Sequence, residues 1–400
     1  MDLKSGYPFW PVKNGLVHVY PALTSDVTCD VAVIGGGITG ALVAFHLMEA
    51  GISTIVLDKR DIGWGSTSAT TALLQYEIDT PLYELVDLVG EDRAVRSYQA
   101  CLGAIHKLEQ LAQKLDDDGD FVRRKSLYLA SRKQDVAGLE KEYAIRRKHG
   151  IRLDWLAEDD IQTHFSFSRP AALLSYDAAQ MDAYRFTHAL FQKAQRNGLA
   201  IFDRTEAAKV TQQKNGVQIT TDRGCQVTAR RIVFATGYES QQYLKHNVAK
   251  LISTYALASE PFPAFPGWYE QCLIWESARP YFYLRTTEDN RALIGGEDED
   301  FRDPVRRDRL LASKTKKLTK KFQALFPHLP LDVAFAWTGT FGETKDGLAY
   351  IGETPDFPHA YFALGYGGNG ITYSILAAEI IRDAILGRPN ADGELFRFDR

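Results

Sequence analysis

The stretch CDVAVIGGGITGALVAFHLMEAGISTIVLDKR, residues 29–60, decides the fold of this chain. Its β-branched run VAVI, at 31–34, is typical of a buried parallel strand. An apolar helix is predicted from about residue 38 to 50, with Gly51 as a natural C-terminal cap. The next run, STIVLD, predicts a second strand that ends at Asp58. This order of strand, glycine-rich turn, helix and strand predicts a βαβ unit within a doubly wound α/β sheet.

The glycines of the turn follow the spacing G-x-G-x-x-G at Gly35, Gly37 and Gly40. Gly35 permits the tight turn, Gly37 lets the backbone approach a pyrophosphate, and Gly40 lets the helix pack closely on the strand. Asp58 can accept hydrogen bonds from ribose hydroxyls, and its carboxylate disfavours a 2′-phosphate. The unit therefore predicts a site for a cofactor with an ADP half, which NAD and FAD share.

Composition excludes several other classes of protein. The chain has 400 residues, of which 45% are hydrophobic and 24% charged, as in an ordinary globular protein of one or two domains. Its net charge of −4 gives no reason to expect nucleic acid as a partner. The most apolar stretch, 31–47, is interrupted by glycines and shorter than the ~20 residues of a transmembrane segment. The first residues lack a signal-peptide core, so we expect a cytoplasmic protein.

The sequence predicts no metal site. Its cysteines, Cys29, Cys101, Cys225 and Cys272, are far apart and form no C-x-x-C pair, which argues against zinc or an iron–sulfur cluster. The nine histidines form no H-E-x-x-H pattern. We expect reduced, mostly buried thiols.

Segments far from the first turn favour FAD over NAD. The run GSTSATTA, 65–72, has small and hydroxyl side chains that would let a bulky phosphate-linked ring system approach the backbone. A helix–glycine–strand pattern follows at 180–203, and a strand in 230–240 breaks at Gly237. A second glycine-rich corner, GYGGNGIT at 365–372, precedes a C-terminal helix. A nicotinamide dehydrogenase would usually keep its cofactor domain in one block, whereas these pieces are spread along the chain.

Together these segments resemble the D-amino acid oxidase superfamily of flavoproteins, which includes glycine, sarcosine and γ-glutamylputrescine oxidases. The resemblance extends from about residue 20 to 387. It implies an α/β fold with a discontinuous, Rossmann-like FAD-binding domain and a substrate domain of antiparallel β-sheet plus helices. We assign 1–85, 155–245 and 335–400 to the FAD-binding domain, and 86–154 and 246–334 to the substrate domain. The segments that carry the resemblance are YPAL (20–23), DVAVIGGGITG (30–40), VLDKR (56–60), GSTSATTALL (65–74), RIVFATG (231–237), YLRTTEDNRALIGGEDE (283–299), TGTFGETKDGLAYIG (338–352) and GYGGNGIT.

The resemblance and the two glycine corners predict which residues contact FAD. The second corner would bring backbone amides and a helix N-terminus to the pyrimidine edge of the flavin, where they stabilise negative charge. In sarcosine-oxidase-like members a cysteine near the segment GTFGETKDG bonds to the flavin, but here no cysteine follows Cys272, so we expect noncovalent FAD. The predicted FAD-binding residues are Gly35, Gly37, Ile38, Thr39, Gly40, Asp58, Lys59, Arg60, Gly65, Ser66, Thr67, Thr71, Ala72, Leu73, Ala207, Ala235, Thr236, Gly237, Gly367, Gly368, Asn369, Gly370, Ile371 and Thr372.

The predicted catalytic residues are Tyr283 and Arg285. They lie in ARPYFYLRTTEDNRALIGGEDED, which reads as a β-hairpin, and their spacing of two places both on one strand face. In the family such a strand faces the flavin, and Arg285 could bind a substrate carboxylate bidentately; a surface cross-strand pair is the alternative. Sarcosine-oxidase-like members bind the substrate carboxylate with an arginine and a lysine, and the corresponding positions here are Ala72 and Thr372. Either Arg285 substitutes for them, or the substrate is not a small amino acid.

Four further residues are weaker candidates for the pocket wall: Gln75, Tyr76, Glu77 and Tyr255. The activity that the resemblance implies is oxidation of the C–N bond of an amine or amino acid by hydride transfer to flavin N5, with oxygen or another acceptor reoxidising the flavin. Two alternatives stay open. One is a flavin-dependent dehydrogenase of 2-hydroxy acids or glycerol phosphate, and the other is a flavoprotein subunit that needs a partner.

Overall fold

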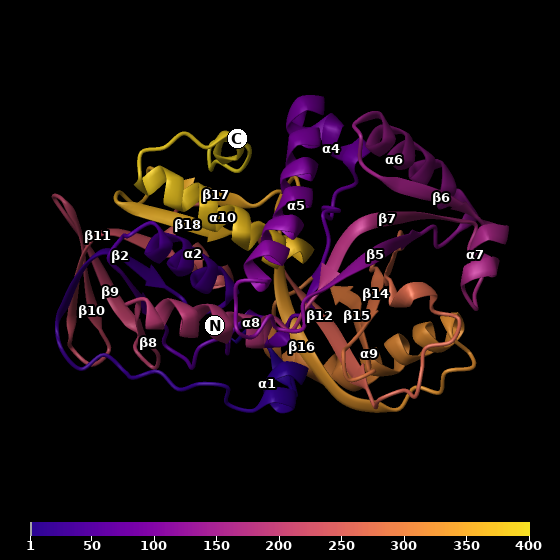
Figure 1. The fold of residues 1–400 in the computed structure, drawn as a ribbon, viewed down its shortest axis with the longest axis horizontal. Helices are drawn as coiled ribbons and strands as arrows, with labels where there is room; N and C mark the ends of the chain where they lie inside the picture. Colours follow the sequence, from indigo (N-terminus) through magenta and orange to yellow (C-terminus); the bar gives the residue numbers. More distant parts are fainter. Residues whose placement is uncertain (1) are drawn as a thin grey trace.

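The computed structural model describes residues 2–400 and contains two β-sheets, which lie side by side in two lobes (Figure 1). The first lobe is on the left of the figure and the second on the right. The strands of the first sheet are β17 (Tyr350–Glu353), β18 (Ala360–Leu364), β11 (Gln226–Phe234), β2 (Val27–Ile34), β3 (Thr54–Leu57) and β8 (Ala200–Phe202), with β10 (Gly216–Thr221) and β9 (Ala207–Gln213) continuing from β11.

Five strands of this sheet are parallel and lie in the order β8, β3, β2, β11, β18. Numbered along the chain this is 3-2-1-4-5, the order of a doubly wound sheet, as the sequence predicts. Ile34 at the end of β2 pairs with Leu57 of β3 and with Phe234 of β11. Because these three strands end level, the residues that follow them meet at one edge of the sheet.

The helices of the first lobe pack on this sheet. Helix α2 packs against both α8 and α10, and α5 packs against α10 beside the junction of the lobes (Figure 1). The helices are α1 (Phe9–Asn14), α2 (Ile38–Glu49), α3 (Ser66–Ala69), α4 (Leu82–Val89), α5 (Glu91–Ala112), α6 (Val136–Lys148), α7 (Glu158–His164), α8 (Ala183–Arg196), α9 (Pro304–Leu325) and α10 (Gly370–Ile385). Short 3-10 helices are η1 (Lys133–Asp135), η2 (Gly237–Tyr243), η3 (Tyr269–Gln271), η4 (Gly367–Asn369) and η5 (Ala391–Leu395).

The second sheet is mostly antiparallel, and α9 covers part of it by packing on β12, β15 and β16. The predicted hairpin is confirmed, because β14 and β15 pair antiparallel. The strands in order are β1 (Ser5–Gly6), β16 (Val333–Glu343), β12 (Lys250–Ser259), β15 (Ala292–Glu299), β14 (Phe282–Thr286), β13 (Leu273–Glu276), β5 (Val122–Leu129), β7 (Ala171–Gln180) and β4 (Leu73–Leu74), with β6 (Leu153–Ala157) paired to β7.

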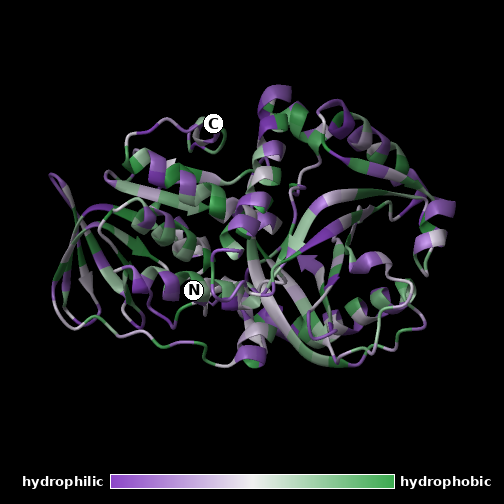
Figure 2. Ribbon diagram, viewed as in Figure 1, coloured by the Kyte–Doolittle hydropathy of each residue, from purple (hydrophilic) through white to green (hydrophobic). Residues whose placement is uncertain are grey.

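Each lobe has its own hydrophobic core. In the first lobe, Leu42 and Phe45 of α2 meet Leu376 of α10, and all three are at most 1% exposed. In the second lobe, Leu318 and Phe322 of α9 are fully buried against the sheet. Figure 2 shows hydrophobic residues along the central strands of the first sheet. Burial of these apolar faces is the main stabilisation of both lobes.

The sheets divide the chain differently from the domain ranges proposed from the sequence. Strands β7 and β16 lie in the second sheet, although 155–245 and 335–400 were assigned to the FAD-binding domain. Helix α5, assigned to the substrate domain, contributes Leu108 to the core of the first lobe. No helix within residues 2–400 combines the length and the apolar character that crossing a bilayer requires.

Candidate functional site

A cavity of about 310 Å³ lies where the level edge of the first sheet faces the second sheet. Gly35, Asp58 and Ala235, which follow β2, β3 and β11, line one part of it. Thr254 of β12 and Tyr283 of β14 line another part. The volume is at the lower end of the range for small-molecule sites, and the position at strand carboxyl ends is where α/β proteins bind ligands.

Most of the residues predicted to bind FAD meet at this cavity, although they come from six separate stretches of the chain. Three predicted site residues do not line it: Gly40, Thr372 and Arg285. Those that do are Gly35, Gly37, Ile38, Thr39, Asp58, Lys59, Arg60, Gly65, Ser66, Thr67, Thr71, Ala72, Leu73, Ala207, Ala235, Thr236, Gly237, Gly367, Gly368, Asn369, Gly370, Ile371 and Tyr283.

The first glycine corner depends on close contact between backbones. Gly35 has a φ of +111°, and a Cβ on it would lie 2.4 Å from the carbonyl oxygen of Ala235. A Cβ on Gly40 would lie 1.8 Å from the carbonyl oxygen of Gly35. Gly40 therefore acts in packing α2 on the strand, which explains why it is absent from the cavity wall. Neither position can hold a side chain without moving the backbone.

Asp58 closes this corner from the neighbouring strand. Its carboxylate accepts hydrogen bonds from the N–H groups of Gly36 at 2.6 Å and Arg60 at 2.8 Å. Burial raises the pKa of Asp58, and these two hydrogen bonds oppose that rise. The side chain thus shapes the turn as well as lining the cavity where a ribose was predicted.

The rim beside Asp58 carries a charged cluster. Glu239 of η2 accepts hydrogen bonds from Lys59 Nζ at 3.1 Å and from Arg60 at 3.0 Å. Glu239 also lines the cavity, and the sequence analysis did not identify it. Its position two residues after the predicted Gly237 is the signal that could have found it.

The loop 65–73 joins the two lobes. Thr67 Oγ1 accepts the N–H of Ile38 at 3.0 Å, which ties the loop to the first turn of α2. At its other end Leu73 pairs with Gln180 at the edge of the second sheet. Between these points Ala72 has a φ of +53°, a left-handed conformation that non-glycine residues seldom adopt. The loop is therefore held at both ends and strained at Ala72, next to its second attachment.

The second glycine corner is tied to the segment that follows this loop. The N–H of Gly368 donates to the Asp79 carboxylate at 2.7 Å. Asn369 Nδ2 donates to the carbonyls of Gln75 at 2.9 Å and Glu77 at 2.8 Å. Thr372 Oγ1 donates to the same Gln75 carbonyl at 3.1 Å, which is why it is buried behind the cavity wall. These bonds fix the start of α10 against 75–79.

Asp79 lines the cavity and was missed by the sequence analysis. Burial raises its pKa, and the hydrogen bond from Gly368 opposes the rise. The signal was its closeness to the weak candidates Gln75 and Glu77, which line the cavity too, whereas Tyr76 belongs to the core. Glu77 lies 3.5 Å from the buried guanidinium of Arg146, and burial raises its pKa.

Aromatic side chains form the part of the wall contributed by the second sheet. Tyr283 pairs with Gly295 of β15, and a Cβ on Gly295 would lie 2.3 Å from the Tyr283 ring. The glycine therefore makes room for this ring. Tyr281, two residues earlier, and Trp275 of β13 also line the cavity. Exposed Arg279 lies over Tyr281, 4.8 Å from the ring centre.

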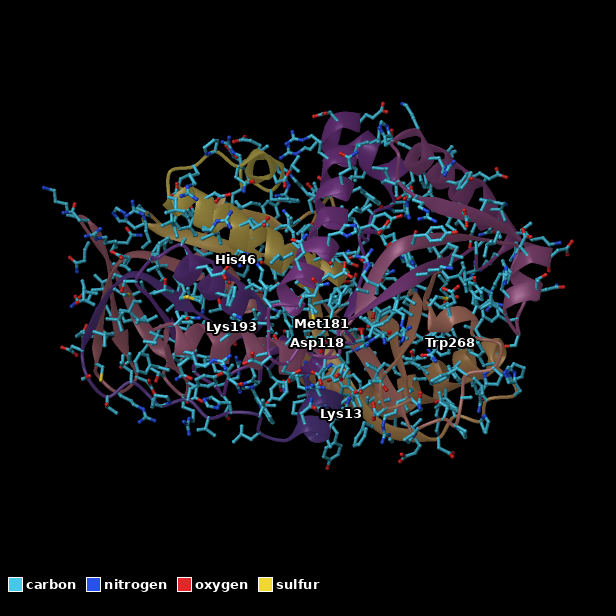
Figure 3. The ribbon with its side chains drawn as sticks, viewed as in Figure 1. Lys13, His46, Asp118, Met181, Lys193 and Trp268 are labelled. Carbon is cyan, nitrogen blue, oxygen red and sulfur yellow. The ribbon has the colours of Figure 1, made fainter. Side chains whose placement is uncertain are left out.

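Arg285 does not reach the cavity, which corrects the prediction that it faces a substrate carboxylate. It is 2% exposed, and its guanidinium donates to the carbonyls of Thr71 at 2.6 Å and Met181 at 2.8 Å. Met181 is labelled near the centre of the molecule in Figure 3. The period of two places Tyr283 and Arg285 on one face, but only Tyr283 lines the cavity, because Arg285 lies behind Thr71 and donates to its carbonyl.

Tyr255, another weak candidate, is fully buried in the core of the second lobe and does not line the cavity. Among residues 2–400 no group of three or more His, Cys, Asp or Glu side chains is placed to hold a metal ion. The cavity instead offers backbone amides, hydroxyls and two glycine-rich turns where a Cβ would meet neighbouring atoms. This set of groups fits a dinucleotide cofactor such as FAD.

Comparison with known proteins also indicates a protein that uses FAD. Residues 30–384 match the protein family described as FAD dependent oxidoreductase. Gamma-glutamylputrescine oxidoreductase of Escherichia coli (strain K12) is 25% identical over 383 residues, covering 92% of this chain and 86% of that protein. Glycine oxidase of Geobacillus kaustophilus (strain HTA426) is 25% identical over 370 residues, covering 89% and 92%.

A solved structure confirms the fold class. The crystal structure of glycine oxidase from Geobacillus kaustophilus matches with a TM-score of 0.77 at 20% identity, covering 91% of this chain and 96% of that one. The mixed α/β fold with two sheets is therefore shared with this enzyme.

Proposed function

This chain belongs to the FAD dependent oxidoreductase family, and we propose that it oxidises the C–N bond of an amine or amino acid. The observation that carries the proposal is the meeting of the predicted FAD-binding segments at one cavity whose wall continues into the aromatic side chains of the second sheet. That arrangement offers a place for a cofactor next to a place for an organic substrate. The relatives named glycine oxidase and gamma-glutamylputrescine oxidoreductase support nitrogen-bearing substrates.

The residues of the first corner and of the second corner would hold opposite ends of one extended FAD. Gly35 and Gly37 would accept the pyrophosphate close to the backbone, and Gly367 to Gly370 would lie along the ring end. When bound, FAD supplies the acceptor for a hydride from the substrate C–H next to nitrogen. We propose that it binds noncovalently, because no cysteine occurs among the described residues that line the cavity.

The second sheet would contribute the substrate pocket. Trp275, Tyr281 and Tyr283 offer apolar, aromatic faces that exclude water from the reacting carbon. Asp79 is a carboxyl group that lines the cavity and could take a proton from the substrate ammonium; burial raises its pKa. The amine must lose this proton before its C–H bond can be oxidised.

The charges of the wall favour an amine over a phosphate-bearing alcohol. Three cationic side chains line the cavity, and two of them, Lys59 and Arg60, contact Glu239 at the rim. Arg279 is the remaining one, and it is exposed beside Asp79 and Tyr281. A doubly charged phosphate would meet one cation near two carboxylates, Glu77 and Asp79. A single substrate carboxylate could still pair with Arg279.

Anaerobic reduction of the purified flavoprotein tests this function. The visible flavin absorption should bleach with at least one member of a panel of primary amines, secondary amines and amino acids. Dithionite reduction of the same sample is the control that the flavin is accessible. Bleaching by 2-hydroxy acids or glycerol phosphate alone would contradict the proposal, and so would the absence of bleaching with the whole panel.

A further inference from the structure

Three buried side chains hold the loop 65–73 from behind the cavity. The carbonyls of residues 69–71 each accept a hydrogen bond from a different donor. Trp337 Nε1 donates to the first at 2.8 Å, Trp10 Nε1 to the second at 2.6 Å, and Arg285 Nε to the third at 2.6 Å. None of these donors lines the cavity, whereas residues 69–71 do. The loop is thus fixed on the side away from the ligand space.

The three donors come from distant parts of the chain, and Trp10 links the other two. Trp10 lies on α1, Arg285 on β14 and Trp337 on β16, and each is at most 2% exposed. The Arg285 guanidinium lies 5.2 Å from the centre of the Trp10 ring, a cation–π contact. Trp10 and Trp337 share one hydrophobic cluster, against which Ala69 packs. Trp10 precedes residue 30, where the family match begins.

The hydrogen bonds fix an otherwise unfavourable backbone. Ala72 is left-handed, and its N–H donates to Thr70 Oγ1 at 3.1 Å. A residue keeps such an unfavourable backbone conformation only where the interactions around it hold it there. Because the preceding carbonyls are each bound by a rigid or buried donor, the loop cannot relax without leaving a buried donor unpaired.

Arg285 also brings a buried positive charge, which Asp182, Asp120 and Asp289 offset only from beyond ion-pair distance. Within residues 2–400 its hydrogen bonds go to the carbonyls of Thr71, Met181 and Thr286, and it forms no ion pair within 4.0 Å. Burial lowers its pKa to about 9, which still leaves it mostly protonated at neutral pH. The positive charge therefore lies directly behind the wall formed by Thr71 and Ala72.

We propose that Trp10, Trp337 and Arg285 form a clamp that holds the loop 65–73 in the shape that binds FAD, and that the Arg285 charge raises the reduction potential of the bound cofactor. In this role the three are positioning residues, since they act through the loop. The inference rests on FAD binding and not on the identity of the substrate.

Indole-to-phenyl substitutions test the clamp, because they remove one donor and keep an aromatic ring. Trp10→Phe and Trp337→Phe should each weaken FAD binding by the apoprotein about tenfold, the effect of one unsatisfied buried carbonyl. The matched control is Trp268→Phe. Trp268, labelled in the second lobe in Figure 3, is 3% exposed and donates to the Cys272 carbonyl at 2.8 Å, away from the loop. The control substitution Trp268→Phe should leave the affinity for FAD unchanged.

Arg285 variants separate shape from charge. Arg285→Lys keeps the charge but cannot reproduce the planar fork, so FAD affinity should fall while the midpoint potential stays near that of the unmodified protein. Arg285→Met should lower both the affinity and the potential, and should change the visible circular dichroism of the bound flavin. If Arg285→Met does not fold, Arg285→Gln removes the charge while keeping an N–H donor and takes its place in the potential measurement, and the indole variants still decide the clamp.

Fluorescence titration of apoprotein with FAD and potentiometry on the loaded protein supply these readouts without any substrate. Wild-type affinity in both Trp10→Phe and Trp337→Phe, or a loss as large in Trp268→Phe, would overturn the clamp. An unchanged potential in Arg285→Met would overturn the part assigned to charge. A failure of every amine to reduce the flavin would contradict the proposed function and leave this inference standing.

Discussion

The two glycine-rich corners of the cavity are built in different ways. In the first, glycines allow backbones to touch: a Cβ on Gly40 would lie 1.8 Å from the Gly35 carbonyl oxygen. In the second, they surround a side chain, because a Cβ on Gly367 would lie 2.3 Å from the Asp79 carboxylate. Backbone cannot retreat as a side chain can. The glycines of the first corner are therefore required for the fold. The glycines of the second corner make room for a carboxylate, whose charge beside the cofactor can be changed by substitution.

The largest effect is expected from Gly40→Ala. The new Cβ would overlap the Gly35 carbonyl, which can move only if α2 leaves the strand, so we expect destabilisation of more than about 4 kcal/mol and loss of FAD. Gly103→Ala in α5 is the matched control, because nothing lies within 4 Å of a Cβ there. It should be neutral or stabilising by about 0.5–1 kcal/mol. Chemical denaturation measures both, and a stable, yellow Gly40→Ala protein would remove the distinction between the corners.

A pH dependence of stability is expected from Asp298 of β15, which feels the charge of Asp79 beside the second corner. Burial raises the pKa of this carboxyl to about 7, with the charges of Asp79 and Glu343 adding to the rise. The folded state then binds more protons than the unfolded state between about pH 4 and pH 7, so stability should fall as the pH rises through this window.

Asp298→Asn removes this titration. Relative to the unmodified protein, the variant should become more stable as the pH rises from 4 to 8, by at most about 4 kcal/mol. Unfolding by urea at a series of pH values gives the difference. Parallel curves for the two proteins would show that Asp298 titrates normally.

A smaller effect is expected from Asp79→Ala. It leaves the Gly368 N–H without its acceptor and should cost about 1–2 kcal/mol of stability, together with a loss of FAD affinity. Asp79→Asn keeps an acceptor oxygen and should recover most of the stability. If the alanine and asparagine variants behave alike, the carboxylate does not organise the second corner.

The smallest effect is expected from Glu239→Gln at the rim of the first corner. Lys59 and Arg60 are 29% and 31% exposed at the side chain, so their pairing with Glu239 is partly screened and should contribute less than about 1 kcal/mol. The difference from the unmodified protein should shrink further in 1 M salt. A larger, salt-independent loss would mean that this rim belongs to the structural part of the first corner.

The sequence was sufficient where the determining interactions are local. The strand, turn and helix around Gly35 and Gly40 follow from neighbouring residues, and so does the start of α10. The period of two correctly placed Tyr283 and Arg285 on one strand face. It could not show that the loop 65–73 separates Arg285 from the cavity, because that depends on how the two lobes meet.

Other site residues were missed for a related reason. Trp10 and Trp337 are separated from the loop by long stretches of chain, and each looks like ordinary core in the sequence. Asp79 and its partner Gly368 are 289 positions apart, so their hydrogen bond is set by long-range folding. Strands β7 and β16 likewise join the second sheet by pairing with strands that are distant in sequence. The domain ranges proposed from the sequence do not include this pairing, and they therefore differ from the division into sheets.

The central claim is that one FAD lies noncovalently across both corners. The most direct measurement is the flavin content of the purified protein before and after denaturation. We expect about one flavin per chain, released as intact FAD into the supernatant when the protein is precipitated, and no flavin with Gly40→Ala. A protein that contains no flavin and cannot be reconstituted with FAD would contradict the account, as would flavin that stays with the precipitate.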